Sequence, residues 1–433
     1  MSRLQLLRLG LFQMAAGGLS VLFLGVLNRI MRVELGIDLF VVGLLVGGGH
    51  YLGALVAIPF GHYSDTHSLA GYRRMAYILL GALIAGIVLM ASPLVARYLS
   101  LATTYSHLLL IFAFFLLEGI ATFIAGTAYL ALIADRTEKR ERGQATGLVW
   151  TLMMVGIIVT GFGASAFMRE YEFDRLVTLF TIGFVVAMTL TVIALWGQEA
   201  RASGVLCSQA SSLRESLLIV VRSRQSRRFA SFLMVGMFSY FMQDVILEPF
   251  GGEVFGLSPF QTTRFNSYMG LGLICGMLFG GVRLVPRHGK RWVTGLGCWI
   301  MVGAFSGLAA SGFLLNPGGL LPLISLLGLG AGLFTVGGVA LMLDMTASRH
   351  AGLFVGVWTL VQAMAKGPAS LVSGGLHGAL IAGGALPGQA YGGVFLIEAT
   401  GLLIAIIMLR RVGVHRFQRE VEHFHTLVSE TLD

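Results

Sequence analysis

Ionisable residues stand in apolar stretches of this chain, where burial would be costly. The stretch QDVILEPFGGEVFG, residues 243–256, follows the apolar run FASFLMVGMFSYFM and contains Gln243, Asp244, Glu248 and Glu253. Asp244 and Glu248 are four residues apart and so share a helix face. An unpaired charge inside a membrane is expensive, so we expect these groups to face a cavity or a cation. Pro249 and the two glycines after it are expected to end the helix.

A second polar stretch supplies the matching cation. In LGVLNRIMRVELGI, residues 24–37, aligning NRIM with QDVI places Arg29 opposite Asp244, which predicts an ion pair near the outer end of a central cavity. For Glu248 and Glu253 the alternative is an interfacial position outside the hydrocarbon. The candidates for lining the cavity and binding a substrate or pigment are Asn28, Arg29, Glu34, Gln243, Asp244, Glu248, Glu253 and Lys366.

Lys366 lies inside an apolar segment beside Gly367-Pro368, where a helix break would free carbonyl groups for it. Its expected partner is Glu398 or Glu118. Three histidines in or near spans could ligate the magnesium of a chlorophyll, although a lone membrane histidine is more often a hydrogen-bonded packing residue: His50, His107 and His377. The three cysteines show no metal-like spacing, so no metal site is expected. No nucleophile–base pair or phosphate loop is visible, and no enzymatic activity is predicted.

The composition places these residues in a membrane protein. The chain has 433 residues, of which 56% are apolar and only 12% charged, about half the charged fraction of a soluble protein. Spanning a bilayer takes about 20 apolar residues per helix. Twelve segments are long enough: 9–28, 39–60, 76–98, 107–134, 145–168, 175–196, 229–248, 266–285, 292–315, 318–343, 351–381 and 391–409. We therefore predict an all-α integral membrane protein with 12 transmembrane helices.

Charge and repetition divide the chain into two six-helix halves. Lysine and arginine gather in the loops on the side of both termini, which the positive-inside rule places in the cytoplasm. ALIADRTEKRERGQATGLVWTL, residues 131–152, resembles LMLDMTASRHAGLFVGVWTL, residues 341–360. The predicted parts are an N-terminal half (1–196), a cytoplasmic linker (197–228), a C-terminal half (229–409) and an amphipathic tail (410–433). This is the major facilitator architecture, whose central site lies between the halves.

A short loop between the second and third spans, GHYSDTHSLAGYRR at residues 61–74, resembles the major facilitator loop signature. Asp65 could cap a helix or pair with Arg142 and so hold one conformation closed. A plain cluster of positive-inside charges is the alternative. The residues predicted to form this cytoplasmic gate are Asp65, Arg73, Arg74, Asp135 and Arg142.

These motifs together resemble a known family. LGVLNRIMRVELG, SDTHSLAGYRR and above all QDVILEPFGGEVFGLSPFQTT are similar to the PucC/LhaA family, the bacteriochlorophyll-delivery branch of the major facilitator superfamily. The resemblance implies a factor in a bacterial photosynthetic membrane that handles chlorophyll or bacteriochlorophyll, with light-harvesting or photosystem polypeptides as partners and no nucleic acid. Two alternatives stay open: a proton-coupled transporter of a small solute, and a structural subunit that binds antenna polypeptides without pigment.

Overall fold

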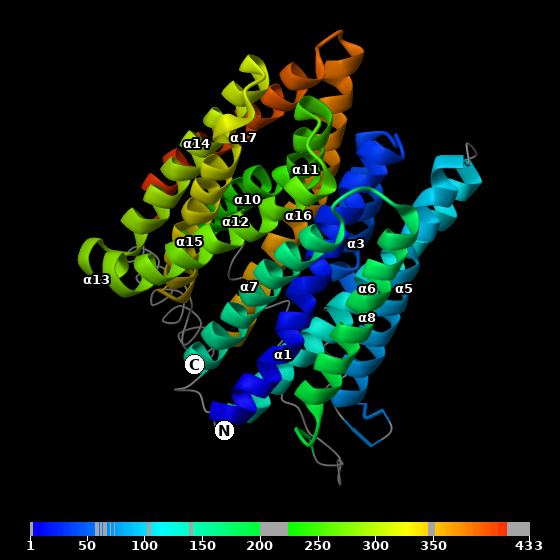
Figure 1. Cartoon of the computed structure of the whole chain (residues 1–433). Coiled ribbons are helices and arrows are strands. Elements are labelled where there is room, and N and C mark those ends of the chain that lie inside the picture. Colours follow the sequence, from blue (N-terminus) through cyan, green and yellow to red (C-terminus); the bar gives the residue numbers. More distant parts are fainter. Residues whose placement is uncertain are drawn as a thin grey trace.

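The chain folds into long helices, as expected. The computed structural model describes residues 3–56, 60, 63, 67–69, 71–72, 74–101, 105–137, 142–199, 224–344 and 351–413. Side chains are not described at 105–106, 134, 142–144, 146, 343–344, 351–360 and 363. The predicted tail helix and most of the predicted linker lie outside these residues. Within them, the ordered elements are almost entirely helical (Figure 1).

The helices of the N-terminal half pack mainly on one another. α1 contacts α7 and α8, and α5 contacts α6 and α8. The first span is α1 (Arg3–Ser20) with the π-helical segments η1 (Val21–Leu27) and η2 (Ile30–Glu34), and the second is α2 (Leu39–Val42), η3 (Gly43–Gly49) and α3 (His50–Leu52). The other four are α5 (Met75–Leu101), α6 (Tyr105–Arg136), α7 (Arg142–Phe167) and α8 (Phe173–Leu195).

The C-terminal half is built in the same way. α12 and α14 pack on α15, and α10 packs on α16 and α17. Its elements are α10 (Arg224–Phe241), α11 (Gln243–Phe255), α12 (Pro259–Phe279), η4 (Gly280–Leu284), α13 (Val285–His288), α14 (Lys290–Leu314), η5 (Pro317–Gly319), α15 (Leu320–Asp344), α16 (Ala351–Ala382) and α17 (Pro387–Arg410). α10 begins at Arg224, inside the stretch assigned to the linker.

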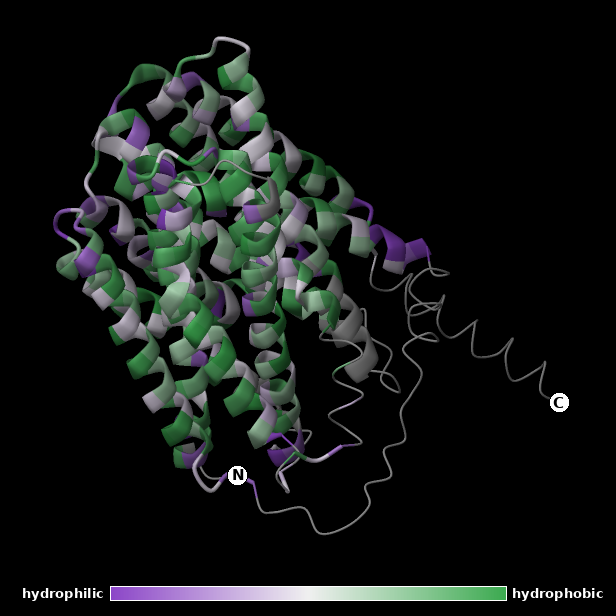
Figure 2. Ribbon diagram, turned by 90° about the vertical axis from the view of Figure 1, so that its right-hand side faces the viewer, coloured by the Kyte–Doolittle hydropathy of each residue, from purple (hydrophilic) through white to green (hydrophobic). Residues whose placement is uncertain are grey.

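The helices are apolar enough to span a bilayer. Eleven helical stretches of the described residues meet the length and composition of a membrane span. α16 is a further helix of 32 residues. Apolar residues cover the helices along most of their length (Figure 2), and many large ones remain exposed at the surface, where lipid would contact them. The chain is an integral membrane protein.

Two predicted helix breaks are absent. α16 continues through Gly367 and Pro368 as one helix, and α11 continues through Pro249 and both glycines to Phe255. α11 ends instead at Gly256, which takes a left-handed φ of 63° that suits glycine. Proline is tolerated inside membrane helices when neighbouring groups satisfy the carbonyl that it leaves without a donor.

The two halves meet along two seams. We call the end of the bundle that carries residues 3, 199 and 224 the linker end, and the opposite end, which carries residues 35–38 and 256–258, the distal end. At the first seam, α7 packs on α12, and the Ser267 hydroxyl donates to the Ile158 carbonyl at 3.0 Å. At the second, α16 packs on α2 and η3, where a Cβ on Gly43 would lie 2.5 Å from the Ser370 carbonyl oxygen. These contacts lie in the distal part of the helices.

Candidate functional site

The QDVILEPFGGEVF stretch forms α11, and the structure places it between the halves. Pro249 has no N–H, so the Val245 carbonyl four residues earlier has no helical donor. Asn28, which is fully buried in the other half, donates from Nδ2 to that carbonyl at 2.9 Å and to the Asp244 carbonyl at 3.1 Å. The proline therefore creates an acceptor, and a side chain of the N-terminal half uses it.

Small residues let α11 approach the first span closely. A Cβ on Gly252 would lie 2.8 Å from the Val33 side chain, and a Cβ on Gly25 would press against Glu248 Oε1 of α11. Asn266 donates to Glu248, which is 4% exposed. Glu248 is therefore buried between the halves and is not interfacial. The two glycines of the motif act through close approach and not as a helix stop.

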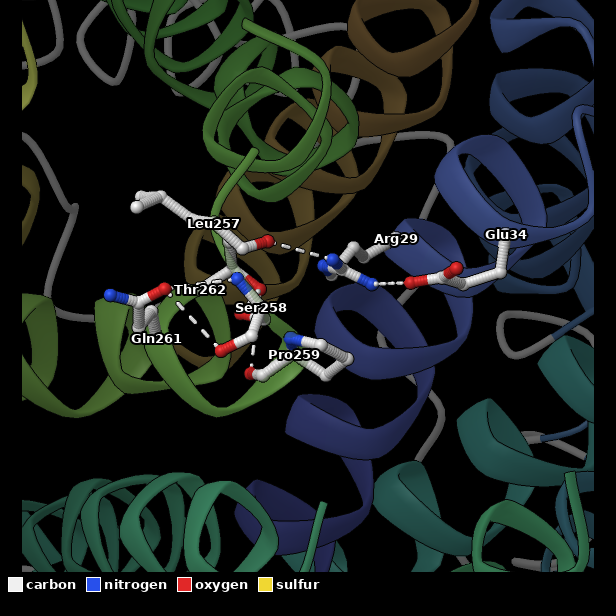
Figure 3. A network of polar contacts seen from close by, with 7 residues as sticks. All are labelled: Arg29, Glu34, Leu257, Ser258, Pro259, Gln261 and Thr262. Carbon is white, nitrogen blue, oxygen red and sulfur yellow. Dashed lines mark hydrogen bonds and ion pairs between the residues drawn. The ribbon is translucent and has the colours of Figure 1, made fainter. Parts of the chain in front are cut away.

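Arg29 does not form the expected ion pair with Asp244. Its Nη1 lies 2.6 Å from Glu34 Oε1, and its Nη2 donates to the Leu257 carbonyl at 2.9 Å (Figure 3). Leu257 belongs to the turn before α12, where Ser258 and Gln261 form a capping box. The pairing fails because α11 turns the Asp244 backbone toward the first span, while the Asp244 side chain contacts Gln243.

A second polar group ties the halves at the distal end. Arg32 Nε lies 2.9 Å from Glu253 Oε1, and the Tyr391 hydroxyl donates to Glu253 Oε2 at 2.5 Å. The His377 ring packs on Tyr391 with 4.2 Å between ring centroids. This arrangement joins η2, α11, α16 and α17. We call the contacts of Asn28, Arg29, Arg32, Glu248 and Glu253 the distal latch.

Deeper in the bundle, Asp244 and Lys366 lie within electrostatic range of one another. Gln243 donates to Asp244 Oδ1 at 2.5 Å, and Lys366 interacts electrostatically with Asp244. The Lys366 ammonium also lies 4.1 Å from the centroid of the Phe241 ring and 5.6 Å from that of Tyr51. The acid near Lys366 is thus Asp244, which corrects the expectation of Glu398 or Glu118.

Glu398 and Glu118 have different surroundings. Glu398 is fully buried in α17, and neither of its carboxyl oxygens has a hydrogen-bond partner among the described residues. It lies within electrostatic range of Asp244. Glu118 in α6 is bonded instead to His50, with 2.5 Å between Oε2 and Nδ1, and accepts from the Thr122 hydroxyl at 2.8 Å. Asp244, Lys366, Glu398, Glu118 and His50 form a buried belt of ionisable groups across both halves, which we call the central belt.

The remaining candidate histidines lie elsewhere. His377 is 1% exposed, and its Nε2 has no partner among the described residues. His107, at the distal start of α6, contacts Tyr98 edge-on at 5.5 Å. Tyr98 lines an open apolar groove of about 330 Å³ together with Leu94, Val95, Leu110, Ile111 and Phe114.

Two of the residues predicted for the cytoplasmic gate pair with one another at the linker end, within the N-terminal half. Arg74 Nε lies 3.5 Å from Asp135 Oδ2, which ties the start of α5 to the end of α6. Glu199 accepts from the backbone N–H of Arg74 and so caps α5. Asp65, Arg73 and the side chain of Arg142 lie outside the described residues, so the predicted pairing of Asp65 with Arg142 stays a prediction.

Sequence reasoning missed several participants. Tyr391, Asn266 and Tyr51 carry no charge, and nothing in their local sequence distinguishes them from packing residues. The sequence suggests Glu118 both as a partner for Lys366 and as a proton-coupling group, but it suggests Glu398 only as a partner for Lys366, although a lone acid in an apolar span is itself a signal of function. No group of three or more potential metal ligands of the His, Cys, Asp and Glu types occurs within the described part of the chain.

Solved structures with this fold are transporters. The nucleoside transporter NupG superposes with a TM-score of 0.69 at 16% identity, covering 94% of this chain and 99% of that one. A bacterial homologue of the human lysosomal transporter Spinster, in an inward-facing conformation, superposes with a TM-score of 0.68 at 16% identity, covering 96% and 97%. The predicted major facilitator fold is confirmed.

Relatives identified by sequence indicate a narrower group of proteins than the shared fold does. The "Bacteriochlorophyll synthase 44.5 kDa chain" of Rhodobacter capsulatus is 34% identical over 421 residues, covering 94% of each chain. "Protein PucC" of Cereibacter sphaeroides is 30% identical over 433 residues, covering 94% of this chain and 91% of the relative. The family model described as PUCC protein matches residues 26–417. The distal latch is built largely from the motif that resembles this family. Because the family model matches residues 26–417, this chain belongs to the PUCC protein family.

Proposed function

We propose that this protein handles chlorophyll or bacteriochlorophyll during the assembly of photosynthetic complexes. The observation that carries the proposal is the match to the PUCC protein family over residues 26–417, together with the relative named as a bacteriochlorophyll synthase chain that aligns along 94% of its length. Membership over nearly the whole chain means that the relative and this protein share one architecture.

The side chains of the central belt support this proposal. The central belt lies between the halves, where transporters of this architecture hold their substrates. It combines ionisable groups with the rings of Tyr51, Phe23 and Phe123 around His50. A tetrapyrrole has a flat apolar ring with a metal at its centre and polar groups at its edge, and this mixture of side chains suits both parts.

We propose that the role is to bind and transfer pigment, and not to synthesise it. Support comes from the fold, because the solved structures that share it are transporters. The antenna or photosystem polypeptide that receives the pigment is the proposed partner.

The distribution of basic residues supports an orientation. We propose that the linker end, with both termini, faces the cytoplasm. The distal latch then closes the side away from the cytoplasm, and pigment would enter and leave between the halves from the cytoplasmic side or from the membrane.

The test is an absorption spectrum of the protein purified gently from photosynthetic membranes. We expect bound pigment near one molecule per chain, together with co-purified light-harvesting or photosystem polypeptides. A transporter of unrelated sequence, purified from the same membranes in the same detergent, controls for pigment dissolved in the micelle. Pigment no higher than in that control would overturn the proposal. Partners retained without pigment would favour a structural subunit.

Proton-coupled transport of a small solute is the second candidate. The observation that favours it is the group of Asp244, Lys366 and Glu398, because buried acids and bases mark proton pathways in transporters. Uptake of a solute into pigment-free vesicles, driven by a pH gradient and lost in Asp244→Asn, would support this function. Equal uptake with and without the gradient would exclude proton coupling.

A further inference from the structure

One histidine of the central belt has a carboxylate on one ring nitrogen and no partner on the other. His50 Nδ1 lies 2.5 Å from Glu118 Oε2, and Glu118 Oε1 accepts from the Thr122 hydroxyl at 2.8 Å. No hydrogen bond joins Nε2 to any of the described residues. The side chain keeps 13% of its surface exposed, whereas Glu118 keeps 7%. Glu118 therefore holds one ring nitrogen of His50, and the other ring nitrogen has no hydrogen-bond partner among the described residues.

This arrangement matches the way proteins prepare a histidine for a metal. Histidines that ligate metals usually donate their other ring N–H to a carboxylate, which fixes the tautomer and makes the ligating nitrogen more basic. With the proton on Nδ1 and Glu118 as the acceptor, the lone pair on Nε2 is free. Thr122 in turn orients Glu118, so three residues from α3 and α6 define one ligating atom.

The surroundings of His50 select a flat apolar ligand over a hydrated ion. The rings of Phe23, Tyr51 and Phe123 lie 5.4, 4.8 and 5.5 Å from the His50 ring, measured between centroids. Aromatic faces at such spacings stack well on conjugated rings. A single histidine in an aromatic setting cannot complete the coordination of a free metal ion, but it can supply the one axial ligand that a metal already held in a macrocycle requires.

His50 also lies next to the other half of the protein. Tyr51, the next residue, contacts Gly367 of α16, where an added Cβ would lie 3.2 Å from the Tyr51 Cβ. The Lys366 ammonium lies 5.6 Å from the Tyr51 ring centroid. A ligand on His50 would thus be positioned to sense movement between the halves.

The other two candidate histidines lack this preparation. His377 has an Nε2 that is buried without a partner among the described residues, and its ring packs at a tilt of 44° against Tyr391. Its 1% exposure leaves no room for a macrocycle. His107 contacts Tyr98 at the distal end of α6, and no carboxylate of the described residues is bonded to it.

We propose that Nε2 of His50 is the axial ligand of the magnesium of a tetrapyrrole, with Glu118 as the residue that positions it. This inference rests on the proposed function and names the site. Binding forms one coordinate bond from the Nε2 lone pair to the metal, while the Nδ1 proton stays in its hydrogen bond to Glu118. The bond is reversible, as delivery of the pigment to another protein requires.

The test compares pigment bound by wild-type protein with that bound by His50→Gln, Glu118→Gln and the matched control His377→Gln. Each is purified in the same mild detergent, and the magnesium coordination is read by resonance Raman spectroscopy. We expect His50→Gln to lose most of the pigment and the signature of a histidine ligand. Glu118→Gln keeps an acceptor for Nδ1 but loses the charge, and we expect about 10–100-fold weaker binding with the histidine ligand retained. His377→Gln should bind as wild type does.

Adding imidazole to a variant without the His50 side chain distinguishes loss of the ligating nitrogen from loss of folding. In His50→Gly the side chain is absent, and added imidazole should restore pigment binding if the only missing part is an axial nitrogen. Thermal unfolding and gel filtration of each variant verify that the fold is intact.

The possible outcomes distinguish failure of the His50 assignment from failure of the proposed function. Wild-type protein without pigment would overturn the proposed function. Wild-type protein with pigment, and His50→Gln with the same amount and an unchanged coordination signature, would overturn the ligand assignment alone. Failure of imidazole to rescue a folded His50→Gly protein would also count against it.

Discussion

Replacing Asn28 should show that this side chain compensates for the backbone N–H that Pro249 lacks. Asn28 is fully buried and donates to the Val245 carbonyl at 2.9 Å. That carbonyl has no helical donor because residue 249 is proline. In Asn28→Ala the carbonyl is left buried without a partner. The Asp244 carbonyl, the second acceptor, keeps the backbone N–H of Glu248 in the helix.

The expected cost follows from one lost acceptor. A buried acceptor left unsatisfied costs about 1–3 kcal/mol, and hydrogen bonds between membrane helices average about 0.6 kcal/mol, with a maximum near 1.7. Asn28 Oδ1 has no partner among the described residues, so its removal relieves part of the loss. We therefore expect Asn28→Ala to lower the free energy of unfolding by about 1 kcal/mol.

A double-mutant cycle isolates the effect. Pro249→Ala restores the backbone N–H, so Asn28→Ala should cost less in that background by about 0.5–1 kcal/mol. Unfolding is followed by circular dichroism in mixed micelles with increasing dodecyl sulfate. Asn316→Ala is the control: it removes a side chain that accepts from the Gly318 N–H at an exposed turn, and its cost should be the same in both backgrounds. Equal costs of Asn28→Ala in both backgrounds, within about 0.5 kcal/mol, would refute the link between Asn28 and the proline.

Three further predictions concern the contacts between the halves. Gly47→Ala places a Cβ against the Ser370 side chain and should lower the free energy of unfolding by about 1–3 kcal/mol. Gly378→Ala, which has open space around it, should not change thermal unfolding. Equal effects of the two variants would mean that α16 and η3 are not closely packed at Gly47. Lys366→Met leaves Asp244 without its cation and should cost about 1–3 kcal/mol, less than the loss of a fully buried pair, because Asp244 and Lys366 are both only partly buried; no change would mean that the ammonium is hydrated. Glu253→Gln should cost about 0.5–1 kcal/mol, because both members of its ion pair with Arg32 are about a fifth exposed, and the difference from wild type should shrink in high salt.

Much of this protein could be predicted from sequence because the membrane acts on each segment separately. Twelve apolar segments, the excess of basic residues on one side and the repeat of residues 131–152 at 341–360 were sufficient for the membrane class and the major facilitator fold. These signals are sums over neighbouring residues and need no knowledge of what packs against them. The resemblance of the QDVILEPFGGEVF motif to the PUCC family rests on the identity of specific residues, and the family model that matches residues 26–417 confirms it.

The partners of the polar residues could not be predicted in this way. Arg29 was matched to Asp244 by aligning the halves, yet it binds Glu34 and the Leu257 carbonyl. Lys366 was matched to Glu398 or Glu118, yet it lies near Asp244. A partner depends on how each helix is rotated about its axis and on how deep it sits, and packing between distant segments sets both.

Helix continuity was decided by the tertiary structure as well. Pro249 and Pro368 read locally as breaks, but both helices continue through them. For Pro249 the compensation comes from Asn28, more than two hundred residues away in the chain. The sequence alone determined that a polar group would be needed in this part of the bundle. Only the packed structure decided which group supplies it, because a carbonyl without a donor can be satisfied by whichever donor the opposite half brings within 3 Å.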